Sequence, residues 1–231
     1  MKLFENFKKN MPTNEQLCEG AVKNVLEGKD KNHIKNNFSA LIDDANSKIY
    51  EAYLKAQSSA GNPLIIARCE QSKEGLFEEF DSFFMSIFQS RKSRAGDAFE
   101  HMIRSLFKSL DYPFSEQINI EGAKPDFILP SEEYFRERPL DCIIFTAKRT
   151  LRERWRQVVT EANKGYGFFL ATIDEKISGS QIDQMARHKV YLVVPKKLKN
   201  EKYAAYYNVL SFEEFFGKHL DPAMSRWGKI I

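Results

Sequence analysis

The sequence predicts an α/β fold, in which a mixed central sheet is flanked by helices and preceded by an N-terminal helical lobe. Three observations predict it. Residues 1–90 carry apolar side chains mostly at helical spacing. Short β-like runs then follow one another from residue 116, and helical segments at about 151–163 and 179–188 separate the later runs. We therefore divide the chain into a lobe, 1–90, and a core, 91–231.

The N-terminal part predicts separate helices. The stretch "NNFSALIDDANSKIYEAYLKAQ" has one apolar face, and "SSAGNP", 58–63, predicts a break after it. The stretch "KEGLFEEFDSFFMSIFQS" repeats apolar residues on a helical stripe, which we interpret as core. A further helix is expected over "SRAGDAFEHMIRSLFKSL", capped by Ser93 or Asp97.

The strands are expected in the second half of the chain. Their predicted ranges are 116–122, 125–130, 140–148, 165–173 and 190–195. The last two are apolar throughout, which is typical of strands buried on both faces of a sheet. A short helix over "SFEEFFGKHL" is expected to close the fold.

Composition excludes several classes of protein. The 231 residues contain no apolar run long enough to span a membrane and no signal peptide at the start, so we expect a cytoplasmic protein. Three scattered cysteines and four scattered histidines indicate neither a disulfide framework nor a zinc site. The net charge of +3 is too small to indicate nucleic-acid binding by itself, so such a function must come from local clusters.

Two residues at predicted strand ends suggest a hydrolytic site. Asp126 begins one apolar strand and Lys148 ends the next, so adjacent strands can bring both to one end of the sheet. A carboxylate there can hold a hard divalent cation, and the lysine can face a phosphate or an attacking water. The pair is a weak signal, because the usual nuclease pattern places a second acid where Thr146 stands.

A second acid is available further along the chain. Glu161 lies on the helix expected at about 151–163, which runs back along the sheet and can return a carboxylate to the metal. Taken alone, Glu161 would be interpreted as a solvated charge on the helix surface.

The stretch between these residues is strongly basic. Five cations surround one acid over residues 148–156 of "KRTLRERWR". Arginines near a helix start can pair with guanine O6 and N7 in the major groove, and Glu153 can accept from cytosine N4. The alternative is a solvated charged face, but its position directly after Lys148 favours a reader of adjacent G·C pairs made by Arg152, Glu153 and Arg154.

These motifs together resemble a known family. The elements "SRAG", "FE", "PDF" and "TAKRTLRERWRQV", followed by a glutamate, are similar to those of the EcoRII/SsoII-like (PspGI-like) type II restriction endonucleases. That family has the PD-(D/E)xK nuclease fold with a displaced second acid, and the resemblance covers roughly residues 85–195. It implies a restriction-endonuclease-like fold and the residue roles given next.

The resemblance implies magnesium ligands at Asp126 and Glu161, with Lys148 and Glu100 completing the catalytic set. It further implies DNA contacts from Arg152, Glu153 and Arg154 in the major groove and from Gln89 in the minor groove. Arg94, in the same "SRKSRAG" stretch, is also expected to contact DNA.

The activity implied is magnesium-dependent cleavage of double-stranded DNA by a homodimer. The target would be a short palindrome of the CCNGG, CCWGG or CCGG type, cut with 5′ overhangs and protected by a cognate methyltransferase. Two alternatives stay open: a structure-selective or repair nuclease on the same fold, and a non-catalytic DNA-binding protein. The central base and the cut position are not fixed by these residues.

Overall fold

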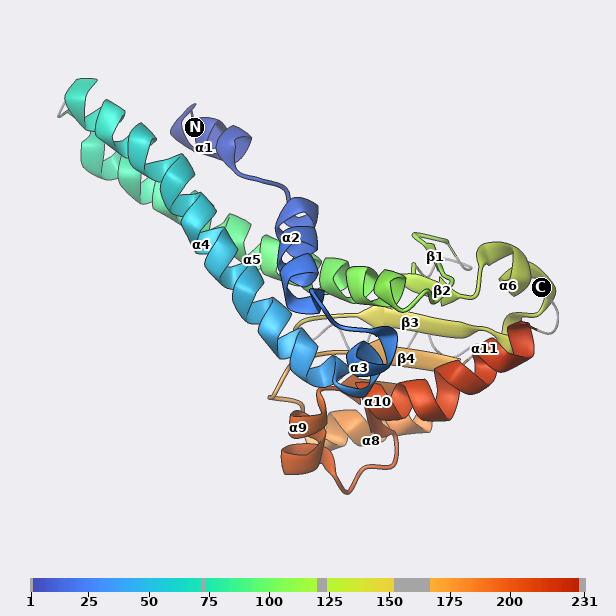
Figure 1. Ribbon diagram of the computed structural model, residues 1–231. Helices are drawn as coiled ribbons and strands as arrows, with labels where there is room; N and C mark the ends of the chain where they lie inside the picture. Colours follow the sequence, from blue (N-terminus) through green and yellow to red (C-terminus); the bar gives the residue numbers. More distant parts are fainter. Residues whose placement is uncertain (1, 72–73, 120–123, 152–166, 229–231) are drawn as a thin grey trace.

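The computed structural model describes residues 2–71, 74–119, 124–151 and 167–228. Its centre is a mixed sheet (Figure 1). The six strands of the sheet lie in sequence order. The strands are β1 (Ser115–Glu116), β2 (Phe127–Leu129), β3 (Ile143–Ala147), β4 (Gly167–Ala171), β5 (Val190–Val194) and β6 (Val209–Ser211). The pairs β1–β2 and β2–β3 are antiparallel, and the pairs from β3 to β6 are parallel.

Helices precede, connect and follow the strands. They are α1 (Lys2–Asn10), α2 (Asn14–Leu26), α3 (Lys31–Asn36), α4 (Phe38–Gln71), α5 (Leu76–Ser109), α6 (Glu132–Glu137), α8 (Gly179–Arg187), α9 (Lys196–Leu198), α10 (Phe212–Phe215) and α11 (Asp221–Trp227). Short 3-10 or π-helical turns cover Pro139–Asp141, Lys199–Tyr203 and Phe216–Leu220. Within the described part of the chain, no helix has the length and apolar character needed to cross a bilayer.

The two longest helices, α4 and α5, form a hairpin that projects beyond the sheet (Figure 1). The predicted break at 58–63 is wrong, because α4 continues through it with Pro63 inside the helix. The ring of Phe7 on α1 lies against the backbone at Gly61, and Ala60 is buried beside it. Tertiary packing of this kind outweighs the weak intrinsic preference of glycine and proline for a helix.

The expected start of a new helix near residue 93 is also wrong. Helix α5 is continuous from residue 76 to residue 109, so Ser93 and Asp97 lie inside it and cap nothing. The helix therefore crosses the division we place at residue 90, and that division stays a prediction. One continuous helix joins the hairpin to the sheet.

The core has a layer on each face of the sheet. Along β2, Phe127 and Leu129 pack against helices α2 to α5, α10 and α11, whereas Ile128 faces the opposite layer with α8. This alternation is the two-residue period of a strand, and both layers are apolar because both faces are covered. A third, smaller cluster joins α1 to the hairpin through Phe7 and Phe83. The predicted fold class, a mixed sheet flanked by helices with an N-terminal helical part, is confirmed.

Two strand predictions differ from the structure. The first run, 116–122, contributes only the two residues of β1, and 120–123 lie outside the described residues. Strand β6 was not predicted, because its three residues are too few to form a recognisable pattern. The parallel order of β4 and β5 agrees with their burial, which is complete at all but one residue of each strand.

Candidate active site at the edge between β2 and β3

The antiparallel pairing of β2 with β3 brings Asp126 and Lys148 together. Phe127 pairs with Phe145, so the residue before β2 lies beside the residues that end β3. The ammonium group of Lys148 donates to both carboxylate oxygens of Asp126, at 3.0 Å to Oδ1 and 2.8 Å to Oδ2. The Asp126 side chain is only 11% exposed, so the pair is partly shielded from solvent.

Two further donors fix the Asp126 carboxylate. The hydroxyl of Thr146 donates to Oδ2 at 2.7 Å, and the backbone N–H of Ala147 donates to the same oxygen at 2.8 Å. Thr146 is buried at the position where the usual pattern has an acid. The threonine thus orients the first carboxylate, and the second must come from elsewhere.

Glu100 on α5 lies on the same side of the site. Burial raises its pKa, the Asp126 carboxylate raises it further, and Arg104 and Lys148 act in the opposite direction. The Asp126 carboxylate therefore lies within electrostatic range of Glu100 and disfavours its charged form. Glu100 and Lys148 both line a cleft of about 440 Å³ between α5 and the segment that follows β3.

Arg104 holds Glu100 in place and was not singled out by sequence reasoning. Its guanidinium donates to Glu100 Oε1 at 2.9 Å and also contacts Glu116 on β1 and Nδ1 of His101. The Arg104 side chain is only 12% exposed. Its spacing of four residues from Glu100, one helical turn, is the signal that could have found it.

The segment after β3 is tied to the end of β4. The N–H of Lys148 donates to Ala171 O at 2.9 Å, and the Leu151 N–H donates to Asp174 Oδ2 at 2.9 Å. The hydroxyl of Thr172 donates to the carbonyl of Arg149 at 3.2 Å. These bonds fix the backbone up to residue 151.

Arg149 turns inward and is a second residue that sequence reasoning gave no separate role. Its guanidinium donates to Asn46 Oδ1 on α4 at 2.5 Å, and burial lowers its pKa. It lies in a cavity of about 170 Å³ with Arg91 and Arg94. The described part of the basic stretch thus points partly into the protein.

Four of the predicted residues cannot be placed. Arg152, Glu153, Arg154 and Glu161 lie outside the described residues, and their roles stay predictions. Within residues 2–71, 74–119, 124–151 and 167–228, no group of three or more His, Cys, Asp or Glu is arranged to hold a metal ion. The described residues bring together Asp126, Lys148 and Glu100.

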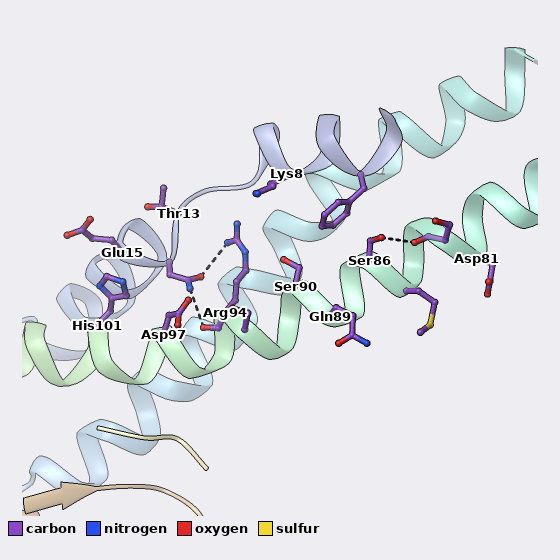
Figure 2. A pocket seen from close by; sticks show the side chains of 15 residues that line it. Lys8, Thr13, Glu15, Asp81, Ser86, Gln89, Ser90, Arg94, Asp97 and His101 are labelled. Carbon is purple, nitrogen blue, oxygen red and sulfur yellow. Dashed lines mark hydrogen bonds between the residues drawn. The ribbon is translucent and has the colours of Figure 1, made fainter. Parts of the chain in front are cut away.

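Gln89 and Arg94 lie on α5 on the N-terminal side of Glu100. They line a groove of about 1140 Å³ that α5 shares with α1 and the start of α2. Figure 2 shows Arg94 reaching towards the linker before α2, where it donates to Pro12 O at 2.8 Å and Asn14 Oδ1 at 3.4 Å. Gln89 points away from α1 in the same view and is exposed. Arg94 is therefore engaged within the protein, whereas Gln89 is accessible.

The donor set suits a hard divalent cation. Asp126 and Glu100 offer carboxylate oxygens, the ligand type that magnesium prefers, and their mutual repulsion would be relieved by a positive ion. Lys148 is the cation that now occupies this position beside Asp126. The described residues thus offer two carboxylates suited to a magnesium ion, and the third ligand expected from the resemblance, Glu161, lies outside them.

Comparison with known proteins identifies relatives. The chain is 34% identical to the type II restriction enzyme EcoRII of Escherichia coli over 134 residues, which cover 56% of this chain and 33% of that enzyme. It is 29% identical to the type II restriction enzyme SsoII of Shigella sonnei over 157 residues, covering 63% of this chain and 51% of that enzyme. The chain thus spans between a third and about half of the curated relatives it matches.

Solved structures share the fold. Metal-depleted Ecl18kI in complex with uncleaved, modified DNA has a TM-score of 0.83 at 23% identity, over 97% of this chain and 83% of that one. A PspGI–substrate DNA complex has a TM-score of 0.69 at 22% identity, over 95% of this chain and 96% of that one.

The model of the EcoRII C-terminal family matches residues 62–216, which is more than half of the chain. The matched range contains Asp126, Lys148, Glu100 and Arg104, so it covers the site described above. The expected resemblance is confirmed, and this chain belongs to the EcoRII C-terminal family.

Proposed function

We propose that the protein is a type II restriction endonuclease that cleaves double-stranded DNA with magnesium at a short palindrome. The observation that carries the proposal is the Asp126–Lys148 pair, whose lysine lines one cleft with Glu100, in a chain of the EcoRII C-terminal family. The names of the curated relatives and the DNA in the neighbouring structures support it.

Each residue of the candidate site has a separate role in the proposed reaction. Asp126 is oriented by Thr146 and Ala147 and, with Glu161, would hold the ion, while Glu100 supports the site from α5. The ammonium of Lys148 would donate to a phosphate oxygen and orient the attacking water. When bound, magnesium would supply a Lewis acid that lowers the pKa of a coordinated water, polarises a phosphate oxygen and offsets charge at the phosphate.

The DNA-reading residues would follow directly from the site. Arg152, Glu153 and Arg154 come immediately after the backbone that is fixed to the end of β4. We propose that they read the C·G pairs of a CC/GG core, of the CCNGG, CCWGG or CCGG type, and that Gln89 probes the minor groove. Arg94 would reach DNA only by releasing Pro12 and Asn14.

A palindromic target implies two-fold symmetry. We propose a homodimer in which each copy reads one half-site and cuts one strand, leaving 5′ overhangs. A cognate DNA methyltransferase would protect the host, and the cytoplasm stays the expected location.

Plasmid digestion tests the proposal. The wild-type protein should give discrete fragments with magnesium and none with a chelator, and Lys148→Ala should stop cleavage. Asp183→Asn, which changes an exposed acid on α8, is the matched control and should cut like the wild type. Smears or cutting of branched DNA alone would instead favour the structure-selective nuclease. No cutting under any condition would favour a DNA-binding protein.

A further inference from the structure

The α4–α5 hairpin carries most of the exposed apolar surface that the structure describes. The exposed large apolar residues on it are Tyr50, Leu54, Ile66, Phe77, Phe84, Met85 and Phe88, whereas outside it they are Leu140 and Tyr207. Phe77 is 82% exposed and Phe84 is 53% exposed. A concentration of this kind marks an interaction surface more than scattered single residues do.

On α5 these side chains share one face with two charges. Residues 77, 81, 84, 88 and 92 are separated by four, three, four and four positions, which is the spacing of a helix–helix seam. They read Phe, Asp, Phe, Phe and Lys, and all five are exposed. The opposite face of α5 is already covered, because Phe83 and Ile87 pack in the cluster with α1. The seam is therefore an open second face of a helix whose other face is occupied.

The charges near this seam change sign along the helix. At the N-terminal end of α5, Glu78 and Asp81 are exposed, and at the end of the seam nearer the sheet Lys92 is exposed. The acids disfavour the phosphate backbone of DNA at the tip of the hairpin. The complementary partner is a protein surface whose charges run in the reverse order along the seam. A second α5 that runs antiparallel to the first has this order.

The positions of these residues agree with one two-fold axis. The midpoint of Phe84 and Phe88 is residue 86, and the midpoint of Asp81 and Lys92 lies between residues 86 and 87. One axis near residue 86 therefore places Phe84 opposite Phe88 of the second copy. The same axis places Asp81 opposite Lys92 of the second copy, on both sides. Lys92 already lies 4.5 Å from the centre of the Phe88 ring, at the edge of the apolar pair.

We infer that the seam formed by Phe77, Asp81, Phe84, Phe88 and Lys92 on α5 is the surface through which two copies of this chain pair antiparallel. The pairing is isologous, because each copy presents the same patch. This inference rests on the proposed function, in which a palindromic target requires a second copy of the chain. It adds which surface associates and in which register.

Charge reversal tests the register. In the wild-type protein, sedimentation equilibrium of the full chain without DNA or magnesium should show a species of twice the 26.8 kDa chain mass. Asp81→Lys alone and Lys92→Asp alone each place like charges opposite each other twice, and each should raise the dissociation constant about tenfold or more. An equimolar mixture of the two variants restores opposite charges at both contacts, so native mass spectrometry should show heterodimers at wild-type concentrations.

Apolar variants test the surface itself. Phe84→Glu should give a monomer, and Tyr207→Glu, an equally drastic change at an exposed aromatic residue outside the hairpin, should leave the dimer unchanged. Circular dichroism verifies that each variant is folded.

Three results would overturn the pairing: a wild-type monomer, single charge variants that associate like the wild type, or a mixture with no gain in heterodimer. Because association is measured without DNA or metal, its outcome is independent of cleavage. Variants that stay dimeric would refute this surface and leave the nuclease standing. If plasmid digestion fails while the mixture of the two charge variants still forms heterodimers, the nuclease is refuted and the pairing stands.

Discussion

Two carboxylates in this protein accept almost the same set of hydrogen bonds and are in opposite electrostatic situations. Asp126 accepts from the Thr146 hydroxyl, the Ala147 N–H and Lys148. Glu214 on α10 accepts from the Ser211 N–H at 2.9 Å, from Lys218 at 3.0 Å and from Lys199. A backbone donor and a lysine are common to both.

The difference lies in the second neighbour of each carboxylate. Glu214 has two lysines and completes the capping box of α10 with Ser211, so its charge is more than neutralised. Asp126 has one lysine and faces Glu100, whose pKa Asp126 helps to raise. A fully neutralised carboxylate stabilises a fold, whereas one held beside another acid is set up to bind a cation. The contrast therefore separates a structural from a candidate catalytic acid.

Substituting each carboxylate by its amide gives the largest expected contrast. Asp126→Asn should lower the cleavage rate at least about a hundredfold, the scale of removing a catalytic group, because the amide carries no charge to hold the ion. Its thermal stability should change little, since the substitution also relieves the repulsion of Glu100. Glu214→Gln should cut like the wild type and unfold at a lower temperature. Equal loss of cleavage in both variants would contradict the distinction.

The pairing of Asp126 with Lys148 could be predicted from the sequence because its signals are local. Asp126 and Lys148 each lie at the end of an apolar run, and the antiparallel pairing of two neighbouring strands is enough to bring them together. Glu100 was found only through resemblance to a family, because a glutamate on a helix has no distinguishing pattern of its own. That it lies near Asp126 depends on the packing of α5, which periodicity does not specify.

The errors of prediction have the same physical origin. Glycine and proline at 61 and 63 indicate a break, but α4 packs against α1 there, and burial of Ala60 favours a continuous helix. The contacts of Arg104 with Glu116 and of Asn46 with Arg149 were not predicted, because each joins residues on different elements. Contacts between elements decide these features, and a single sequence does not encode them in any local pattern.

A smaller effect is expected at Arg104, whose guanidinium pairs with both Glu100 and Glu116. Arg104→Met leaves Glu100 and Glu116 without their shared cation and should lower the free energy of unfolding by about 1–3 kcal/mol. The pKa of Glu100, already raised by burial and Asp126, loses a group that lowers it and should rise further. Cleavage that needs ionised Glu100 should then require a higher pH, so the acid limb of the rate–pH profile should move upwards.

The control for Arg104 is another arginine with a glutamate one helical turn away. Arg136 pairs with Glu132 on α6, but the Arg136 side chain is 75% exposed. Arg136→Met should change stability by well under about 1 kcal/mol, because solvent screens such a pair. A rate–pH profile that moves equally in both variants, or in neither, would contradict the positioning role of Arg104.

The smallest effect is a pH dependence of stability that belongs to Glu214. Burial acts to raise its pKa, but hydrogen bonds from Lys199, Ser211 and Lys218 outweigh burial and hold the pKa at about 2, below the ordinary 4.5. A depressed carboxylate contributes stability above its unfolded pKa and loses it as the pH falls towards its folded pKa. The stabilisation should therefore be complete above about pH 5 and decline towards pH 2, by about 1 kcal/mol or less because the side chain is 29% exposed and solvent screens its ion pairs. Urea unfolding of wild type and Glu214→Gln measures this, since the stability difference between them should shrink as the pH falls through that window. A constant difference from pH 6 to pH 2 would show that Glu214 acts by packing or capping alone and that its charge contributes nothing.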